Sequence, residues 1–205
     1  MDPQPIDRMR KKPAQARSEQ TVATIIEATA QVLEREGEAG LTTNRLAEQA
    51  GFSIGTLYQY FPNKDSILRL LAERERARIE SAVAAVVRDP DAAGLEPVMR
   101  AIIDIAIGTF GHRVQLRRAL LLRFFKSDLA ATVGQTVDVI GRLVAEAVAR
   151  HGGTAMRPLS EARAYVLTRA IAGAIRGAVL ENSPLLRTGE FKEELVQLAL
   201  AFLRA

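Results

Sequence analysis

The sequence predicts an all-α protein of about nine helices, and three observations lead to this fold class. Apolar residues recur throughout the 205 residues at the three- and four-residue spacing of one helix face. No stretch alternates with a period of two for long enough to indicate a strand, and no Asn-Gly or Asp-Gly turn joins two apolar runs. Gly, Pro and Ser residues interrupt the helical spacing at intervals that suit helices of ordinary length.

These interruptions set the order of the expected helices. The first three helices are expected from near Ser18, a plausible N-cap, to Gly37, from Leu41 to Gly51, and from Ser53 to Phe61. A long helix should run from Lys64 to about Val87, because Asp89 and Pro90 close it. Five further helices are expected at about 95–110, 113–125, 127–150, 160–182 and 188–204.

Composition is that of an ordinary globular protein, with 48% hydrophobic and 25% charged residues. The longest run without charge, residues 49–63, is too short and too polar to span a bilayer, which needs about 20 apolar residues. The basic start lacks the apolar segment of a secretion signal. We therefore expect a cytoplasmic protein with no membrane partner. Since the chain has no Cys, disulfides, thiol nucleophiles and Cys-based zinc sites are excluded.

The net charge of +4 is not by itself a sign of nucleic-acid binding. Residues 1–70 hold nine basic and nine acidic side chains, so the whole excess comes from residues 71–205. Residues 1–17 nevertheless contain a basic cluster with no acid inside it, made of Arg8, Arg10, Lys11, Lys12 and Arg17. Such a cluster is usually a solvated tail and sometimes an arm that contacts nucleic acid.

Residues 41–64, LTTNRLAEQAGFSIGTLYQYFPNK, carry the clearest pattern in the chain. Two short helices joined by a turn that contains Gly are typical of a helix-turn-helix. Ala47 is small enough for the two helices to cross closely, and Gly51 suits the left-handed turn that only Gly adopts cheaply. Leu46, Leu57 and Phe61 can then form a small core with the first helix.

The second of these helices leaves Thr56, Tyr58, Gln59 and Tyr60 facing away from that core. Hydroxyl and amide groups in this position suit the phosphate oxygens and base edges of a major groove. Either tyrosine alone would more often cap the core of a three-helix module, but the complete run favours contact with DNA. Because this helix has no charge, pairing of an arginine with guanine is available only from Arg45 or the basic arm.

The run TTNRLAEQAGFSIGTLYQYFPNKDSIL resembles the TetR family of bacterial transcriptional repressors, and the resemblance covers residues 18–68. It implies a basic arm at 1–17, a helix-turn-helix DNA-binding domain at 18–64, and an effector-binding and dimerisation domain at 65–205. The DNA-contacting residues that it implies are Thr43, Asn44, Gly55, Thr56, Tyr58, Gln59, Tyr60 and Lys64. It further implies a palindromic double-stranded DNA operator, from which a small hydrophobic or amphipathic effector of unknown identity releases the protein.

The last two helices indicate a homodimer. Residues 164–180 carry only two charges, so this helix should be buried on more than one side. The final helix has two neighbouring apolar stripes. The alternative is that both helices are interior helices of a monomer, but such helices would need fewer apolar surfaces. The resemblance implies a four-helix bundle with a second subunit. The expected interface residues are Gly173, Gly177, Leu195 and Phe202.

The resemblance also implies an effector pocket within the second domain. Phe110, Phe124, Phe125 and Tyr165 could line it, although aromatic residues at helical spacing are more often plain core. Two isolated histidines without acidic partners do not make a metal site. Because the chain has no Gly-rich phosphate loop and no nucleophile elbow, we expect neither an enzyme nor a cofactor. The alternative is an all-α adaptor that uses the three-helix head for protein contacts.

Overall fold

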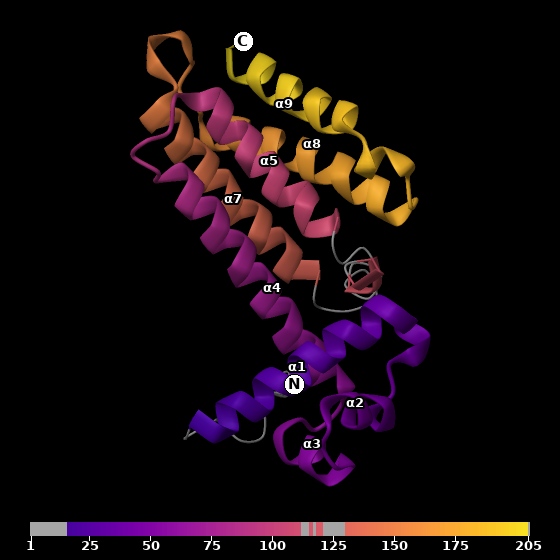
Figure 1. Cartoon of the computed structure of the whole chain (residues 1–205). Coiled ribbons are helices and arrows are strands. Elements are labelled where there is room, and N and C mark those ends of the chain that lie inside the picture. Colours follow the sequence, from indigo (N-terminus) through magenta and orange to yellow (C-terminus); the bar gives the residue numbers. More distant parts are fainter. Residues whose placement is uncertain (1–15, 112–114, 117, 121–129, 205) are drawn as a thin grey trace, which may run out of the picture. The chain divides into compact units, whose positions relative to one another are not determined.

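The computed structural model describes residues 16–111, 115, 116, 118–120 and 130–204, and helices make up most of them (Figure 1). The longer helices are α1 (Ala16–Glu36), α2 (Thr43–Ala50), α3 (Ile54–Tyr60), α4 (Lys64–Val87), α5 (Leu95–Gly111), α7 (Ala130–His151), α8 (Glu161–Leu180) and α9 (Gly189–Arg204). Three short 3-10 helices, η1 (Glu38–Gly40), η2 (Gly153–Ala155) and η3 (Pro184–Arg187), lie between them. No strand occurs within the described residues, so the all-α prediction is confirmed.

The helix bounds follow the sequence pattern closely. The predicted long helix is α4, with both ends as expected, and the later helices differ from their predicted bounds by a few residues. The prediction that Ser18 caps α1 is wrong, because the helix already begins at Ala16. Most of the helix predicted at 113–125, and the basic arm apart from Ala16 and Arg17, lie outside the described residues.

The chain divides into two compact units, which we call the head and the body. The head comprises residues 1–75 and 115–120, and the body comprises residues 76–114 and 121–205. The division falls inside α4, between Glu75 and Arg76, whereas the sequence suggested a boundary where α4 begins. The first turns of α4 therefore pack with the head.

The head is built on the apolar face of α1. The buried residues of this face include the predicted ones, Val22, Ile25, Ile26, Thr29, Val32 and Leu33. Helix α1 packs against α2, and α2 packs against α3. The predicted core residues Leu46, Leu57 and Phe61 are each 0% exposed. The only hydroxyl on the α1 face, that of Thr29, donates to the carbonyl oxygen of Ile25 at 2.8 Å, so its burial leaves no unmet hydrogen bond.

The turn between α2 and α3 needs the glycine that the sequence supplies. Gly51 ends α2 with φ of 72° and ψ of 28°, a left-handed conformation that costs other residues free energy. The next residue, Phe52, donates its backbone N–H back to the carbonyl of Ala47 at 2.9 Å. The prediction of a left-handed turn at Gly51 is confirmed.

A side-chain cap is present at the start of each of the helices α2, α3 and α4. The Thr42 hydroxyl accepts a hydrogen bond from the backbone N–H of Arg45 at 3.2 Å, and the Ser53 hydroxyl accepts one from Thr56 at 3.1 Å. The side-chain oxygen of Asn63 accepts from the backbone N–H of Ser66 at 2.9 Å. Each cap meets one of the backbone donors that the start of a helix leaves unsatisfied.

The body has a separate apolar core formed by the second half of α4 together with α5, α7, α8 and α9. Helix α5 packs against α9, and α7 packs against α8. Deeply buried residues from the body helices include Val87, Ile103, Val144, Ala147, Val179, Val196 and Ala199. Arg100 of α5 pairs with Glu193 of α9 at 2.5 Å, and this guanidinium lowers the pKa of Glu193 to about 2. No helix in the described part of the chain is long and apolar enough to cross a bilayer.

The packing of α3 predicts how two neighbouring apolar residues contribute to stability. Leu57→Ala removes a side chain that is fully buried and should lower the free energy of unfolding by about 2–5 kcal/mol. Ile54→Ala removes an exposed side chain from the same helix and should change it by no more than about 0.5 kcal/mol. Urea denaturation followed by circular dichroism measures both. Equal losses would show that α3 does not pack as described.

Candidate nucleic-acid interface

Helix α3 buries one large side chain, Leu57, and exposes most of the others. Ile54 is 42% exposed and Tyr58 is 41% exposed, and Gly55 and Gln59 are exposed as well. Thr56 and Tyr60 are half-buried. The surface of α3 therefore presents hydroxyl, amide, aromatic and aliphatic groups without a charge, as the sequence predicted.

The two tyrosines are held in different ways. The Tyr58 hydroxyl donates to the Oγ1 atom of Thr43 at 3.5 Å and so links α3 to the first residue of α2. The Tyr60 hydroxyl donates to the Oγ atom of Ser18 at 3.4 Å, which links α3 to the first turn of α1. Both distances are at the long limit for a hydrogen bond, so either hydroxyl can exchange its partner at little cost. The structure thus brings together Thr43 and Tyr58, two of the predicted contact residues.

Gly55 has no structural need to be a glycine within its own chain. Its backbone is helical, and a Cβ atom placed on it would meet only the Ser53 hydroxyl, at 3.7 Å. An alanine would fit there and would favour the helix. The open space above Gly55 allows another molecule to approach the α3 backbone closely.

The start of α2 lies next to this surface. Thr43 is half-buried and Asn44 is exposed, and both belong to the first turn, where backbone N–H groups carry partial positive charge. Such a helix start attracts anions. Lys64, half-buried, is the first residue of α4 and brings a full positive charge to a third helix start in the same unit.

The sequence allowed Arg45 to pair with a guanine, but in the structure its guanidinium is bound to other side chains. Its Nε and Nη2 atoms donate to Oε1 of Glu36 at 2.9 and 2.7 Å, and its Nη1 atom donates to Glu48 at 2.9 Å. The hydrogen bond from Arg45 lowers the pKa of Glu36, and the two carboxylates raise the pKa of Arg45 further above its usual value. The guanidinium is therefore occupied by two carboxylates of the head.

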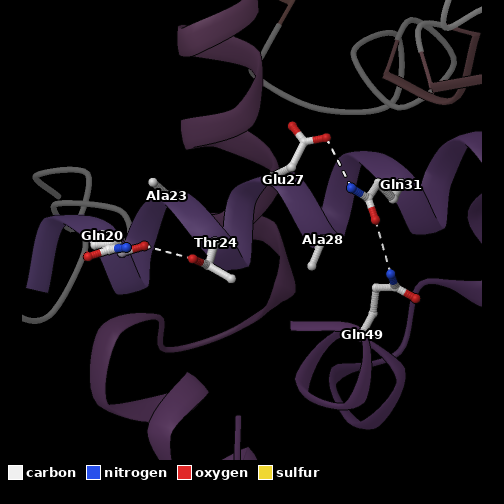
Figure 2. Close-up of a pocket in the computed structure, with 7 residues that line it drawn as sticks. All are labelled: Gln20, Ala23, Thr24, Glu27, Ala28, Gln31 and Gln49. Atoms are coloured by element: carbon white, nitrogen blue, oxygen red, sulfur yellow. Dashed lines mark hydrogen bonds between the residues drawn. The ribbon is translucent and has the colours of Figure 1, made fainter. Parts of the chain in front are cut away.

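A shallow groove runs along the exposed side of α1, and Figure 2 shows the residues that line it. They are Gln20, Ala23, Thr24, Glu27, Ala28, Gln31 and Gln49. The Gln49 amide donates to Gln31 at 3.0 Å, and the Gln31 amide donates to Glu27 at 3.2 Å (Figure 2). This chain of hydrogen bonds ties α2 to α1 and already uses much of the groove's polar lining. None of the residues predicted to line an effector pocket belongs to it.

The residues predicted for the effector pocket are not brought together within the described residues. Phe124 and Phe125 lie outside them, and of Phe110 only the backbone, in the last turn of α5, is described. Tyr165 is 55% exposed on α8, where the guanidinium of Arg169 lies 3.7 Å from the ring centre. The structure therefore places Tyr165 on the surface of the single chain and not inside it.

The residues predicted for a dimer interface fall in three environments. Gly173 and Gly177 are half-buried on α8. Phe202 is half-buried with the guanidinium of Arg163 at 5.0 Å from its ring centre. Leu195 is only 4% exposed and belongs to the core of the body, so it has almost no surface left for a partner.

The exposed apolar residue of α9 is Leu198, which the sequence prediction did not select. It belongs to the same predicted apolar stripe as Leu195, three residues earlier, and the apolar pattern alone does not say which residues of a stripe face the chain's own core. Val166 and Tyr165 of α8 are also exposed.

The fold and the exposed face of α3 define a helix-turn-helix transcriptional regulator with a separate helical domain. Residues 25–71 match the family model described as bacterial regulatory proteins, tetR family. Residues 95–203 match the model described as tetracyclin repressor-like, C-terminal domain. The chain therefore belongs to the TetR family.

Individual relatives agree with this family. The nucleoid occlusion factor SlmA of Haemophilus ducreyi is 28% identical over 173 residues, which cover 83% of this chain and 80% of that protein. The transcriptional repressor KstR of Rhodococcus jostii is 29% identical over 128 residues, covering 62% of this chain and 57% of that protein. The structure of the fatty acid degradation regulator FadR from Bacillus halodurans superimposes with a TM-score of 0.70 at 20% identity, covering 95% of this chain and 98% of that one. This likeness shows a shared fold.

The contact between Glu36 and Arg45 predicts a pH-dependent stability. Because the folded-state pKa of Glu36 lies below its usual 4.5, the pair stabilises the fold above that pH and loses its effect as the pH falls through the lowered pKa. Glu36→Gln should therefore lower the melting temperature slightly near pH 7, and this difference should shrink steadily below about pH 4.5. Melting curves between pH 7 and pH 2 measure it.

Glu73→Gln is the matched control, since it removes one negative charge from an exposed position of α4 within the head. A difference between wild type and Glu36→Gln that stays constant with pH would contradict the described ion pair.

Proposed function

We propose that this protein is a transcriptional repressor that binds a palindromic DNA operator as a homodimer. The observation that carries the proposal is the exposed, uncharged face of α3, next to a capped start of α2. Helix α3 can enter a major groove with Gln59 and Tyr58 outward, while Gly55 lets its backbone come close. The name of the relative KstR, a transcriptional repressor, supports the direction of regulation.

Phosphate contacts would come from groups around α3. The first turn of α2 offers Thr43 and its backbone N–H groups, and Lys64 offers a full charge at the first turn of α4. Asn44 and Gln59 carry exposed amides, the type of group that pairs with adenine. Since no charged side chain lies on α3, we expect modest affinity for one half-site, and a second subunit then supplies the rest.

Lys64 gives the most direct test of this interface. Lys64→Gln should reduce the slope of the logarithm of the binding constant against the logarithm of salt concentration by about 0.9, because one phosphate contact is lost. The loss should be similar for every DNA sequence, whereas Gln59→Ala should change which sequences are preferred. Fluorescence anisotropy with a duplex of about 30 base pairs, titrated with KCl, measures the slope. Little retention on DNA at any salt concentration would instead favour the adaptor function.

The exposed apolar residues of α8 and α9 support a second copy of the chain as partner. Val166 is 53% exposed and Leu198 is 47% exposed, and both lie on the two helices that the family resemblance assigns to the dimer. Small residues of α8 beside them, including Gly173 and Gly177, leave room for a helix to approach closely. A large, well-packed apolar contact is what an obligate homodimer requires.

Gly173→Glu tests the dimer without disturbing the single chain. A Cβ atom at Gly173 would meet nothing within 4 Å, and glutamate favours a helix more than glycine does, so the variant should fold. It should sediment as a monomer of 22.4 kDa and bind DNA weakly, while the wild type sediments at twice that mass.

Gly108→Glu is the matched control, because Gly108 also lies in a helix, α5, with open space around its Cβ position. A dimeric Gly173→Glu variant, or a monomeric wild type at micromolar concentration, would contradict the proposed interface.

We further propose that a small hydrophobic or amphipathic effector releases the protein from its operator. This part rests on the family, since residues 95–203 match a tetracyclin repressor-like C-terminal domain. A thermal-shift screen identifies ligands, and each hit is then tested for release of DNA. An effector that binds the DNA-free state about 100-fold more tightly would weaken operator binding by the same factor, or about 2.7 kcal/mol.

A further inference from the structure

The Arg45 guanidinium is bound by the carboxylates of Glu36 and Glu48, and we call these two residues the acidic clamp. All three guanidinium nitrogens donate to the clamp: Nε and Nη2 to Glu36, and Nη1 to Glu48. The contact with Glu36 uses two nitrogens, the same fork by which arginine binds a phosphate group. The carboxylate of Glu36 therefore occupies the donors that a DNA phosphate would need.

The backbone of the head is shaped to seat this clamp. A Cβ atom on Gly40 would lie 2.4 Å from the Cβ atom of Glu36 and 2.6 Å from its Oε2 atom. Any side chain at position 40 would therefore push Glu36 out of its place beside Arg45. The missing Cβ leaves the Glu36 carboxylate where it reaches across from the end of α1 to the first turn of α2.

The clamped arginine lies where a cation would matter for DNA. Arg45 follows Thr43 and Asn44 on the first turn of α2, and its side chain is 34% exposed. Within the cluster, two carboxylates bind one guanidinium, and Arg35 also acts on Glu36, so Arg45 brings no net positive charge to the first turn of α2. The helix start that we propose for phosphate contact therefore gains no attraction from Arg45.

We propose that Glu36 and Glu48 withhold Arg45 from DNA phosphates, and that the acidic clamp thereby lowers the affinity of the head for DNA of any sequence. The inference rests on the proposed DNA-binding function. A phosphate contact strengthens binding to every sequence, because phosphates carry no sequence information. Occupying one cation with carboxylates therefore lowers the sequence-independent part of the binding free energy, and contacts to bases supply a larger share of it. Arg45 and its clamp then limit how strongly the head holds arbitrary DNA, without contacting a base.

The test uses the full chain and a duplex of about 30 base pairs with arbitrary sequence. The variant E36Q/E48Q removes both negative charges and leaves Arg45 with neutral neighbours. It should bind this duplex at least about threefold more tightly at low salt, and the salt slope should become steeper by about 0.9, as expected for one added phosphate contact. The further variant E36Q/E48Q/R45Q should lose both the added affinity and the added slope.

Two controls separate a released cation from a change in overall charge. The variant E19Q/E73Q also removes two carboxylates from exposed positions in the head, and it should leave the salt slope unchanged. The triple variant E36Q/E48Q/R45Q is the second control, because it keeps the same neutral neighbours at positions 36 and 48 but lacks the cation. If E36Q/E48Q does not fold, as judged by circular dichroism, E48Q and E48Q/R45Q form the second pair, with a smaller gain that again requires Arg45.

Each outcome bears on one of the two claims. The inference is overturned if E36Q/E48Q gains nothing, or if its gain persists in E36Q/E48Q/R45Q. In these cases the proposed function stands as long as K64Q still reduces the slope. If the wild type does not bind DNA at any salt concentration, the proposed function and the inference fail together.

Discussion

The apolar face of α1 is the support on which the helix-turn-helix of the head depends. Helices α2 and α3 have only eight and seven residues, and isolated helices of that length do not persist in water. They are held because Leu46, Leu57 and Phe61 are fully buried in the head and because a threonine and a serine cap their starts. Since one buried leucine fixes which side of α3 faces inward, it also fixes which side faces DNA.

The charged side chains of the head all lie outside α3. The exposed face of α3 carries no charge, and Arg45 of the preceding helix is bound by Glu36 and Glu48. Lys64 is left to bring a positive charge to the start of α4. Such a surface favours reading of bases by amides and hydroxyls over strong attraction to any phosphate backbone. Affinity must then come from two heads acting together, which links the proposed dimer to the proposed readout.

Much of the fold could be predicted from the sequence, because helical spacing and breakers are local properties. The ends of α4, the left-handed Gly51 and the buried Leu46, Leu57 and Phe61 all follow from such local patterns. Three features depended on distant contacts and could not be predicted in this way. Glu36 reaches Arg45 only because Gly40 makes room for it; Leu195 faces the core of the body while Leu198 does not; and Tyr60 reaches back to Ser18 over 42 positions. A pattern of residue types shows which faces are apolar, but the partner of each face is set by the tertiary fold.

The central claim is that two heads read one operator through α3. Hydroxyl-radical footprinting on genomic DNA fragments that the protein retains tests it most directly. The account predicts two protected half-sites with inverted sequences, whose centres are about one helical turn, roughly 34–36 Å, or a multiple of it apart. A single protected stretch without two-fold symmetry would contradict it.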